Sequence, residues 1–322
     1  HAGLDGGGDH VDPLVHAVME QQANLAAALA ELILREVEVE VVSFSEPIGG
    51  NEALQILLDS HADSHPSADA DSATVLENAA QELARKLGVD HLEFRNVAPR
   101  HMEWPTQDLY VTFRKAILPD VDENMQAIPR KQRAMVRKGI KNGLLSTVDR
   151  NSERFFTLYA DNVHRHGTPA MPKHYFDTLL QVFGDDCEVL TVTGPDGRLL
   201  SSVFSFYFRD EILPYYAGDD ESARHLAAND FKYWELMRRS CERGLKVFDY
   251  GRSKHGTGSF AFKKNWGFEP TPLHYEYCLY KRDSIPQNNP ANAKYRLFIE
   301  AWRRMPIGLA NWLGPHIVRN LG

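Results

Sequence analysis

Residues 247–270 read VFDYGRSKHGTGSFAFKKNWGFEP. The stretch begins as a short apolar strand, continues as a basic loop broken by glycines, and enters a short helix closed by Trp266-Gly267-Phe268. Glycine lets backbone N–H groups approach a ligand closely. The stretch therefore predicts a site for an anionic or carbonyl-bearing ligand at the end of a strand. Its positive charge comes from Arg252, Lys254, Lys263 and Lys264.

The residues around this stretch alternate between helical and extended patterns. After a helix with Ser152 as its expected N-cap and a second over 172–183, three strands should form an antiparallel meander. A helix capped by Asn229 or Asp230 and ending at Gly244 then leads into the glycine loop. We expect one mixed sheet with the site at its strand ends. The expected strands are 188–193, 199–208, 212–217, 246–250 and 274–280, with a helical turn at 260–265.

The first ninety residues show weaker patterns. An Ala- and Leu-rich helix is expected over 14–35 and a strand over 37–44, followed by a polar linker over 61–72. A helix over 74–87 should stop at Gly88. Short strands are then expected at 91–95 and 109–113.

Composition indicates a globular protein with about two cores. The chain has 322 residues, of which 43% are hydrophobic and 25% charged. Residues 1–100 carry 18 acidic against 5 basic side chains, whereas the remainder is net +5 within an overall charge of −8. We therefore expect residues 101–322 to bind a negatively charged ligand. The alternative is that the acidic residues 1–100 only offset the positive charge of the rest of the chain.

The three cysteines, Cys187, Cys241 and Cys278, are far apart and lack ligand-spaced partners, which favours neither disulfides nor a zinc site. A reducing cytoplasm fits this pattern, and no signal peptide or membrane span is expected. We predict no metal. The histidines at 164, 166, 225 and 255 are expected at the surface, with His255 the one of interest because it lies in the glycine loop.

The order of elements resembles the GNAT acyltransferase fold, and Asn265-Trp266-Gly267-Phe268-Glu269 is similar to the aromatic-Gly-Phe ending of that superfamily. The run 129–139, PRKQRAMVRKG, and Phe248-Asp249-Tyr250-Gly251 before Phe262-Lys263-Lys264 resemble FemAB-type aminoacyltransferases. The runs 251–260 and 314–319 resemble the FemAB-related branch associated with exosortase and PEP-CTERM systems.

This resemblance covers about residues 88–322 and implies an α/β fold with a mixed α+β sheet and two GNAT-like halves. The expected division is an atypical, degenerate acidic half over 1–128, a basic linking helix over 129–145, a GNAT-like domain over 146–285 and an amphipathic tail over 286–322.

The resemblance also implies a choice of acyl donor. GNAT enzymes hold the coenzyme A pyrophosphate with a glycine-rich loop after the fourth strand, at a helix N-terminus. The equivalent residues here, 218–229, lack that pattern, which favours aminoacyl-tRNA over acyl-CoA. The implied partner is a phosphate-bearing substrate, either aminoacyl-tRNA or a lipid- or nucleotide-linked precursor.

The basic helix offers a phosphate site. Spacings of three and four place Arg130, Arg133, Arg137 and Lys141 on roughly one face, with Lys138 beside them. Such a face binds rows of phosphates, although a solvated helix face is the ordinary explanation of a charge run. We expect it to share a cavity with the glycine loop.

Three side chains are candidate catalytic groups for acyl transfer. Asp249 could orient the amine or accept its proton, Lys263 could offset the charge of an oxyanion or a phosphate, and Tyr216 could donate a proton. The duller alternatives are a turn cap for Asp249, a solvated lysine and core packing for Tyr216. The remaining expected substrate-binding residues are Arg252, Ser253, Lys254, Gly256, Gly258 and Lys264.

The C-terminal stretch 295–317 mixes apolar and arginine side chains. It fits a helix packed on the body or an interfacial helix on a membrane. The sequence thus predicts a FemAB-like transferase of acyl or aminoacyl groups, acting on an amine of a cell-envelope or exopolysaccharide precursor. It is expected in the cytoplasm, with the inner membrane face as the alternative place. A CoA-dependent N-acetyltransferase and a non-catalytic RNA- or lipid-sugar-binding module remain alternatives.

Overall fold

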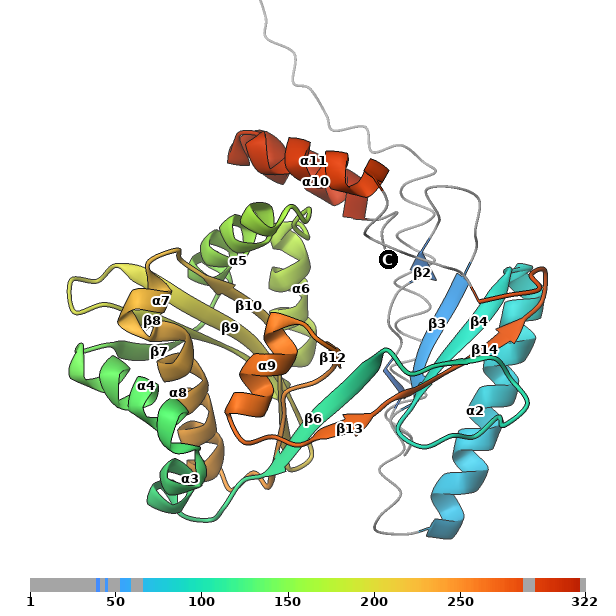
Figure 1. The fold of residues 1–322 in the computed structure, drawn as a ribbon, viewed down its shortest axis with the longest axis horizontal. Helices are drawn as coiled ribbons and strands as arrows, with labels where there is room; N and C mark the ends of the chain where they lie inside the picture. The colour runs from blue at the N-terminus through green and yellow to red at the C-terminus, as the bar shows by residue number, and fades with distance from the viewer. Residues whose placement is uncertain (1–38, 41–43, 46–52, 59–65, 286–292, 319–322) are drawn as a thin grey trace, which may run out of the picture.

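The computed structural model describes residues 39–40, 44–45, 53–58, 66–285 and 293–318, which form two sheets with helices around them (Figure 1). The first sheet has the strand order β1-β3-β4-β14-β5, with β2 paired to β3. Its helix is α2, Pro66–Leu87. The strands are β1 Val39–Glu40, β2 Phe44–Ser45, β3 Ala53–Leu58, β4 His91–Asn96, β5 Thr106–Gln107 and β14 His274–Leu279.

The second sheet has the order β12-β6-β11-β10-β9-β8-β7, with β13 on the other side of β6. All of its pairs are antiparallel except β10 with β11, so it is mixed as the sequence predicts. The strands are β6 Tyr110–Ala116, β7 Leu145–Asp149, β8 Cys187–Thr193, β9 Leu199–Phe208, β10 Glu211–Asp219, β11 Val247–Asp249, β12 Ser253–Lys254 and β13 Pro270–Pro272. The strand expected in this sheet at 274–280 is wrong in its place, because β14 pairs with β4 and β5 of the first sheet.

Helices cover both faces of the second sheet because its central strands bury both faces. Leu190 and Val203 pack toward α8, whereas their neighbours Val189 and Phe204 pack toward α5 and α6, as the two-residue period of a strand dictates. The helices are α3 Val121–Ala127, α4 Arg130–Lys141, α5 Glu153–His166, α6 Lys173–Phe183, α7 Ala223–Leu226, α8 Ala228–Glu242 and α9 Gly258–Asn265, with a 3₁₀ turn at Gly184–Asp186.

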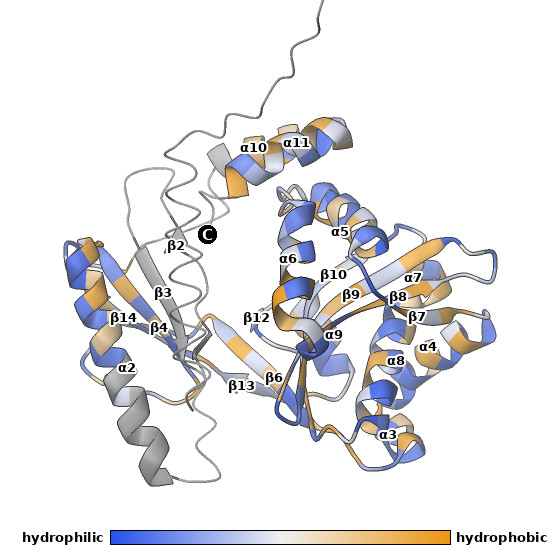
Figure 2. Ribbon diagram, turned by 180° about the vertical axis from the view of Figure 1, so that it is seen from behind, coloured by the Kyte–Doolittle hydropathy of each residue, from blue (hydrophilic) through white to orange (hydrophobic). Residues whose placement is uncertain are grey.

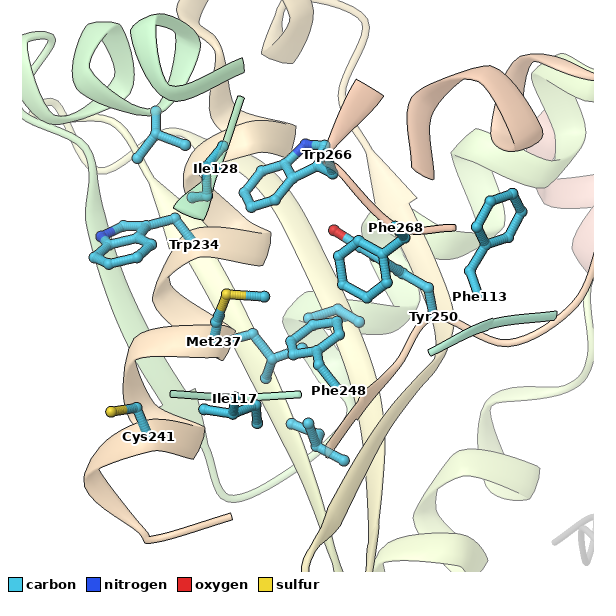
Figure 3. Packing of buried hydrophobic residues seen from close by; sticks show 14 of the residues in the cluster. Phe113, Ile117, Ile128, Trp234, Met237, Cys241, Phe248, Tyr250, Trp266 and Phe268 are labelled. Atoms are coloured by element: carbon cyan, nitrogen blue, oxygen red, sulfur yellow. The ribbon is translucent and has the colours of Figure 1, made fainter. Parts of the chain in front are cut away.

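The core beside α8 contains large aromatic side chains from distant parts of the sequence (Figure 3). Met237 of α8 lies beside Phe248 of β11, Trp234 belongs to the same cluster, and Trp266 and Phe268 close the cluster after α9. Trp266, Phe248 and Phe268 are at most 1% exposed. This packing holds the end of α9 against α8 and so fixes the chain on either side of the glycine loop.

Most of the predicted elements after residue 88 are confirmed, whereas the following expectations, most of them for earlier residues, differ from the structure or are tested only in part. The linker expected over 61–72 is wrong for 66–72, because α2 begins at Pro66, a residue suited to the first helical position. Of the strand expected over 37–44, residues 39–40 and 44 are extended in β1 and β2, and the rest lies outside the described residues. The N-cap of α8 is Ala227, not Asn229 or Asp230. The helix expected over 14–35 lies outside the described residues.

The two sheets exchange strands. β6 precedes residue 128 but lies in the second sheet, whereas β14 lies within 146–285 and pairs with β4 and β5 of the first. The sheets are therefore joined through two chain crossings, and the division into the expected domains stays a prediction. The C-terminal stretch forms two helices, α10 Ala293–Arg304 and α11 Ile307–Val318, separated at Pro306.

Candidate active site

The parallel strands β10 and β11 pair at their beginnings and then diverge. Only Glu211 with Val247 and Ile212 with Phe248 are paired, although β10 continues to Asp219. A register shift between Pro214 and Tyr216 against β9 marks a β-bulge, which turns β10 away. On the other side the chain leaves β11 at Asp249 and follows β6 as β12. The opening lies between the second half of β10 and the turn 250–252.

Lys263 of α9 reaches back to this turn. Its Nζ donates hydrogen bonds to the backbone carbonyls of Gly251, at 3.1 Å, and Arg252, at 3.0 Å. Burial lowers the pKa of Lys263 to about 8, with Arg252 acting in the same direction and Asp249 opposing. An ammonium group with this pKa both gains and loses protons near neutral pH, as proton transfer in catalysis requires.

Asp249 is buried and already bonded. It accepts hydrogen bonds from Arg114 Nη1 at 2.7 Å and from the backbone N–H of Gly251 at 2.6 Å. Arg114 also binds Glu211 of β10, so this ion-pair cluster ties β6, β10 and β11 together where β10 diverges. These contacts favour a positioning role for Asp249, whose predicted catalytic role stays a prediction.

Arg252 is held among tyrosines at the junction of the two sheets. Its Nη1 donates to the hydroxyl of Tyr275 at 2.5 Å, and its guanidinium carbon lies 4.8 Å from the ring centre of Tyr110. Tyr215, the bulged residue of β10, also interacts with it electrostatically. An immobilised guanidinium of this kind suits planar recognition of a carboxylate or phosphate.

The glycine loop has open space beside two of its glycines, but two of its backbone N–H groups already donate hydrogen bonds within the protein. Gly256 has φ +75°, which favours glycine, and a Cβ at either Gly256 or Gly258 would meet open space. The N–H groups of His255 and Thr257 already donate to the carbonyls of Leu109 and Lys254. Ser253 is buried and accepts a hydrogen bond from Ser259, whereas Lys254, Gly256, Gly258 and Lys264 are exposed.

Tyr216 lies in the aromatic cluster between β10 and α6. Its hydroxyl is 2.9 Å from that of Tyr175, and burial raises its pKa above the ordinary tyrosine value. A hydroxyl with a raised pKa is a weaker acid, so these contacts favour packing over proton donation, and the predicted role of Tyr216 is left to experiment.

The basic face of α4 forms a groove. Its lining is Arg130, Arg133, Ala134, Arg137, Lys138 and Lys141, around a hollow of about 480 Å³, and includes no residue of the glycine loop. The two regions are linked instead through Asp230 of α8. Its carboxylate accepts hydrogen bonds from Gln132 of α4 and from Trp266 Nε1, the latter at 3.1 Å. The glycine loop precedes α9, whereas Trp266, just after α9, shares Asp230 with the buried face of the helix whose outer face carries the groove.

Sequence reasoning missed the part that Asp230 plays. A carboxylate near the start of a predicted helix was expected to cap it, but Asp230 is buried, and burial raises its pKa. No local pattern distinguishes these roles, because Gln132 and Trp266 are distant in the sequence. The cluster around Arg252 was missed for the same reason, since Tyr110 and Tyr275 come from opposite ends of the described chain.

Comparison with known proteins identifies the fold. Residues 128–264 match the family model described as an acetyltransferase (GNAT) domain. The second sheet, with its diverging parallel pair, therefore has a GNAT-like acyltransferase fold. The crystal structure of FemX, at 13% identity, aligns with a TM-score of 0.55 over 76% of this chain and 88% of that one. The C-terminal domain of a protein described as a lysylphosphatidylglycerol synthetase of Agrobacterium fabrum aligns at 15% identity with a TM-score of 0.56, over 84% and 94%.

A sequence relative is the UDP-N-acetylmuramoylpentapeptide-lysine N(6)-alanyltransferase of Weissella viridescens. It is 22% identical over 161 residues, which are 49% of this chain and 48% of the relative. The chain therefore matches about half the length of this curated relative. Across the described ranges, no group of three or more His, Cys, Asp or Glu side chains gathers as a metal site would require.

Proposed function

We propose that this protein transfers an acyl or aminoacyl group from an ester- or thioester-linked donor onto an amine. The observation that carries the proposal is Lys263, whose Nζ lies at the turn after β11 with a pKa of about 8. The GNAT-like fold and the Fem-type alanyltransferase relative support the reaction class.

The proposed step moves one proton through Lys263. The neutral amine of Lys263 accepts a proton from the acceptor amine, directly or through one water, as the acceptor nitrogen attacks the donor carbonyl carbon. The carbon–oxygen or carbon–sulfur bond of the donor then breaks as the amide forms. The Lys263 ammonium returns the proton to the leaving atom, so that the atoms and charges balance.

The start of α8 argues against coenzyme A as the donor. In GNAT enzymes a helix N-terminus in this position binds the pyrophosphate. Here α4 covers it closely, because a Cβ on Gly139 would lie 3.2 Å from the carbonyl oxygen of Ala227 and 2.8 Å from Cβ of Phe231. Asp230 occupies the first turn with a buried carboxylate. An added pyrophosphate would meet backbone and negative charge.

The groove on α4 supports a donor with several phosphates. Arg130, Arg133, Arg137 and Lys141 follow one another at three- and four-residue steps, so they span about 16 Å at a rise of about 1.5 Å per residue. A single pyrophosphate needs one cluster of charge, whereas a polynucleotide presents a phosphate at each nucleotide. We therefore favour aminoacyl-tRNA as the donor, with this groove on its backbone.

The acceptor is proposed as an amine of a cell-envelope precursor carrying a nucleotide or lipid phosphate. The relative from Weissella viridescens is named for adding alanine to a lysine of a UDP-linked muramoyl pentapeptide, which supports an amine acceptor of this class. Arg252, held by Tyr275 and Tyr110, is the proposed contact for an acceptor carboxylate or phosphate. The proposal also includes an exopolysaccharide precursor as the acceptor and an association with exosortase and PEP-CTERM systems. It further includes a location in the cytoplasm.

The test is a transfer assay that separates esters from amides. The protein is incubated with radiolabelled mixed aminoacyl-tRNA, or with radiolabelled acetyl-CoA, and with nucleotide-sugar and lipid extracts of bacteria. Mild alkali then destroys aminoacyl esters and leaves amides intact. Alkali-stable label from aminoacyl-tRNA, lost in Lys263→Met and retained in Lys264→Met, is the expected result.

Two other results would overturn parts of the proposal: the first would overturn aminoacyl-tRNA as the donor, and the second would overturn catalysis itself. Label from acetyl-CoA alone would assign the protein as a CoA-dependent N-acyltransferase, the alternative favoured by the acetyltransferase family match. Binding of tRNA without any alkali-stable product from any extract would leave a non-catalytic binding module.

A further inference from the structure

The C-terminal hairpin, residues 293–318, is fixed to the body by one side. Trp302 is only 2% exposed, and Arg303 donates to the backbone carbonyl of His166 at 3.2 Å. A Cβ on Gly167 would lie 2.5 Å from Cγ2 of Ile299, so α10 sits closely on the end of α5. Figure 2 shows the two helices at one edge of the molecule, beside α5 and α6. The sequence expectation of a packed C-terminal helix is thus confirmed for this side.

The other side of the hairpin is apolar and exposed. α11 reads IGLANWLGPHIV and is apolar around most of its circumference, yet it buries only Ala310 and Gly314. A helix of this composition is normally buried on all sides. The exposed large apolar residues of the hairpin are Leu297 at 72%, Trp312 at 66%, Leu309 at 45%, Ile307 at 41% and Phe298 at 38%.

The charge at this end of the chain is positive. Residues 301–322 contain three arginines and no aspartate or glutamate, in a chain whose net charge is −8. Arg304 is exposed at the end of α10, separated from the start of α11 by two residues, whereas Arg303 bonds to the body through His166. Arginine beside exposed tryptophan and leucine is the combination that anionic membrane interfaces attract, because apolar groups enter the acyl boundary while guanidinium groups meet phosphates.

We propose that the C-terminal hairpin docks on the surface of an anionic phospholipid bilayer. It lies in the interface and does not span it, because each helix has 12 residues and is about 18 Å long, against about 30 Å of hydrocarbon. In the described part of the chain, no helix is long and apolar enough to cross a membrane. The occupant is lipid in preference to protein because α11 offers few polar groups besides Asn311 and His316 for directional contacts.

Flotation of the full-length protein with vesicles tests this directly and does not depend on catalytic activity. Phosphatidylcholine vesicles with and without phosphatidylglycerol are compared at low and high salt. The protein should float with the anionic vesicles at low salt. Leu309→Ser with Trp312→Ser should weaken partitioning at least about ten-fold, since it removes two apolar anchors. Arg304→Gln should weaken it about five-fold.

Met102→Ser is the matched control, because Met102 is 80% exposed and lies between β4 and β5, outside the hairpin. It should float like the original protein, and circular dichroism should show that all variants are folded. Three results would overturn the proposal: no flotation with anionic vesicles, equal flotation of the Leu309/Trp312 variant, or a dimer in light scattering that this variant disperses. The last result would mean that the exposed apolar side of the hairpin binds a second copy of the chain and not a membrane.

Discussion

Lys263 offers the sharpest test, because its environment sets the pH at which it exchanges a proton. Burial beside Arg252 lowers its pKa from 10.5 to about 8. The neutral fraction of such a lysine rises about ten-fold between pH 7 and pH 9 and then levels off. An unshifted lysine would rise about 100-fold over the same range without a plateau. The two cases therefore differ in both slope and shape.

The pKa can be measured without any substrate. Competitive acetylation of the folded protein by limiting acetic anhydride at several pH values, read by mass spectrometry, reports the neutral fraction of each lysine. Lys263 should titrate near pH 8. Lys264 is the internal control, because it is the adjacent residue and is exposed. Titration of Lys263 above pH 10 would contradict the inferred environment.

Once a donor and acceptor are known, kcat/KM should follow the same curve. It should rise about ten-fold from pH 7 to pH 9, because the neutral amine accepts the proton. Lys263→Arg keeps a positive charge but cannot lose it, so it should lose about 10²- to 10⁴-fold in rate and show no inflection near pH 8. If the inflection persisted in Lys263→Arg, another group would be the base and our mechanism would be wrong.

Three further substitutions test other parts of the site. Arg133→Glu with Arg137→Glu should abolish tRNA binding in a filter assay while the melting curve stays unchanged, and equal binding would refute the role of the groove. Gly139→Ala should destabilise the fold by about 1–3 kcal/mol, because its Cβ would press on Phe231, whereas Gly308→Ala, where a Cβ meets open space, should not lower the Tm. Tyr216→Phe should cost about 1 kcal/mol of stability by leaving Tyr175 unpaired and should leave kcat within about two-fold; a loss of 10²-fold or more would restore Tyr216 as a proton donor.

Local patterns predict most of the second sheet. The alternation of residues 187–219 and the turns at 194–197 and 209–211 specify the meander, because each strand pairs with its neighbour in sequence. The buried face of α8, with Phe231, Trp234, Met237 and Cys241, follows from the 3.6-residue period. The helical period lies within one element, and the strand and turn patterns lie between elements that are adjacent in the sequence, so local reasoning detects both.

Caps and ion pairs are less predictable because their partners are distant. Ser152 lies at the predicted N-cap of α5, yet its hydroxyl donates to Asp177 of α6 at 2.5 Å and makes no cap hydrogen bond. Asp249 ends its strand as expected, but its pairing with Arg114 depends on β6 entering the second sheet. That crossing joins residues more than a hundred positions apart and leaves no periodic signal.

The two faces of α4 connect the fold to the choice of donor. Gln132, Val136 and Gly139 form its buried face. Gln132 donates a hydrogen bond to Asp230, and Gly139 lies against Ala227 and Phe231 at the start of α8. A GNAT enzyme that uses coenzyme A needs that helix N-terminus free for phosphate. The opposite face of α4 carries the groove of arginines and lysines. The helix that covers one phosphate position thus carries a second phosphate position on its opposite face. Lys263 lies in the last turn of α9, and Trp266 just after this helix shares Asp230 with Gln132 of α4, so a donor bound in the groove must reach from α4 to the last turn of α9. A tRNA acceptor end, with its aminoacyl ester beyond several unpaired nucleotides, is suited to bridge these two elements.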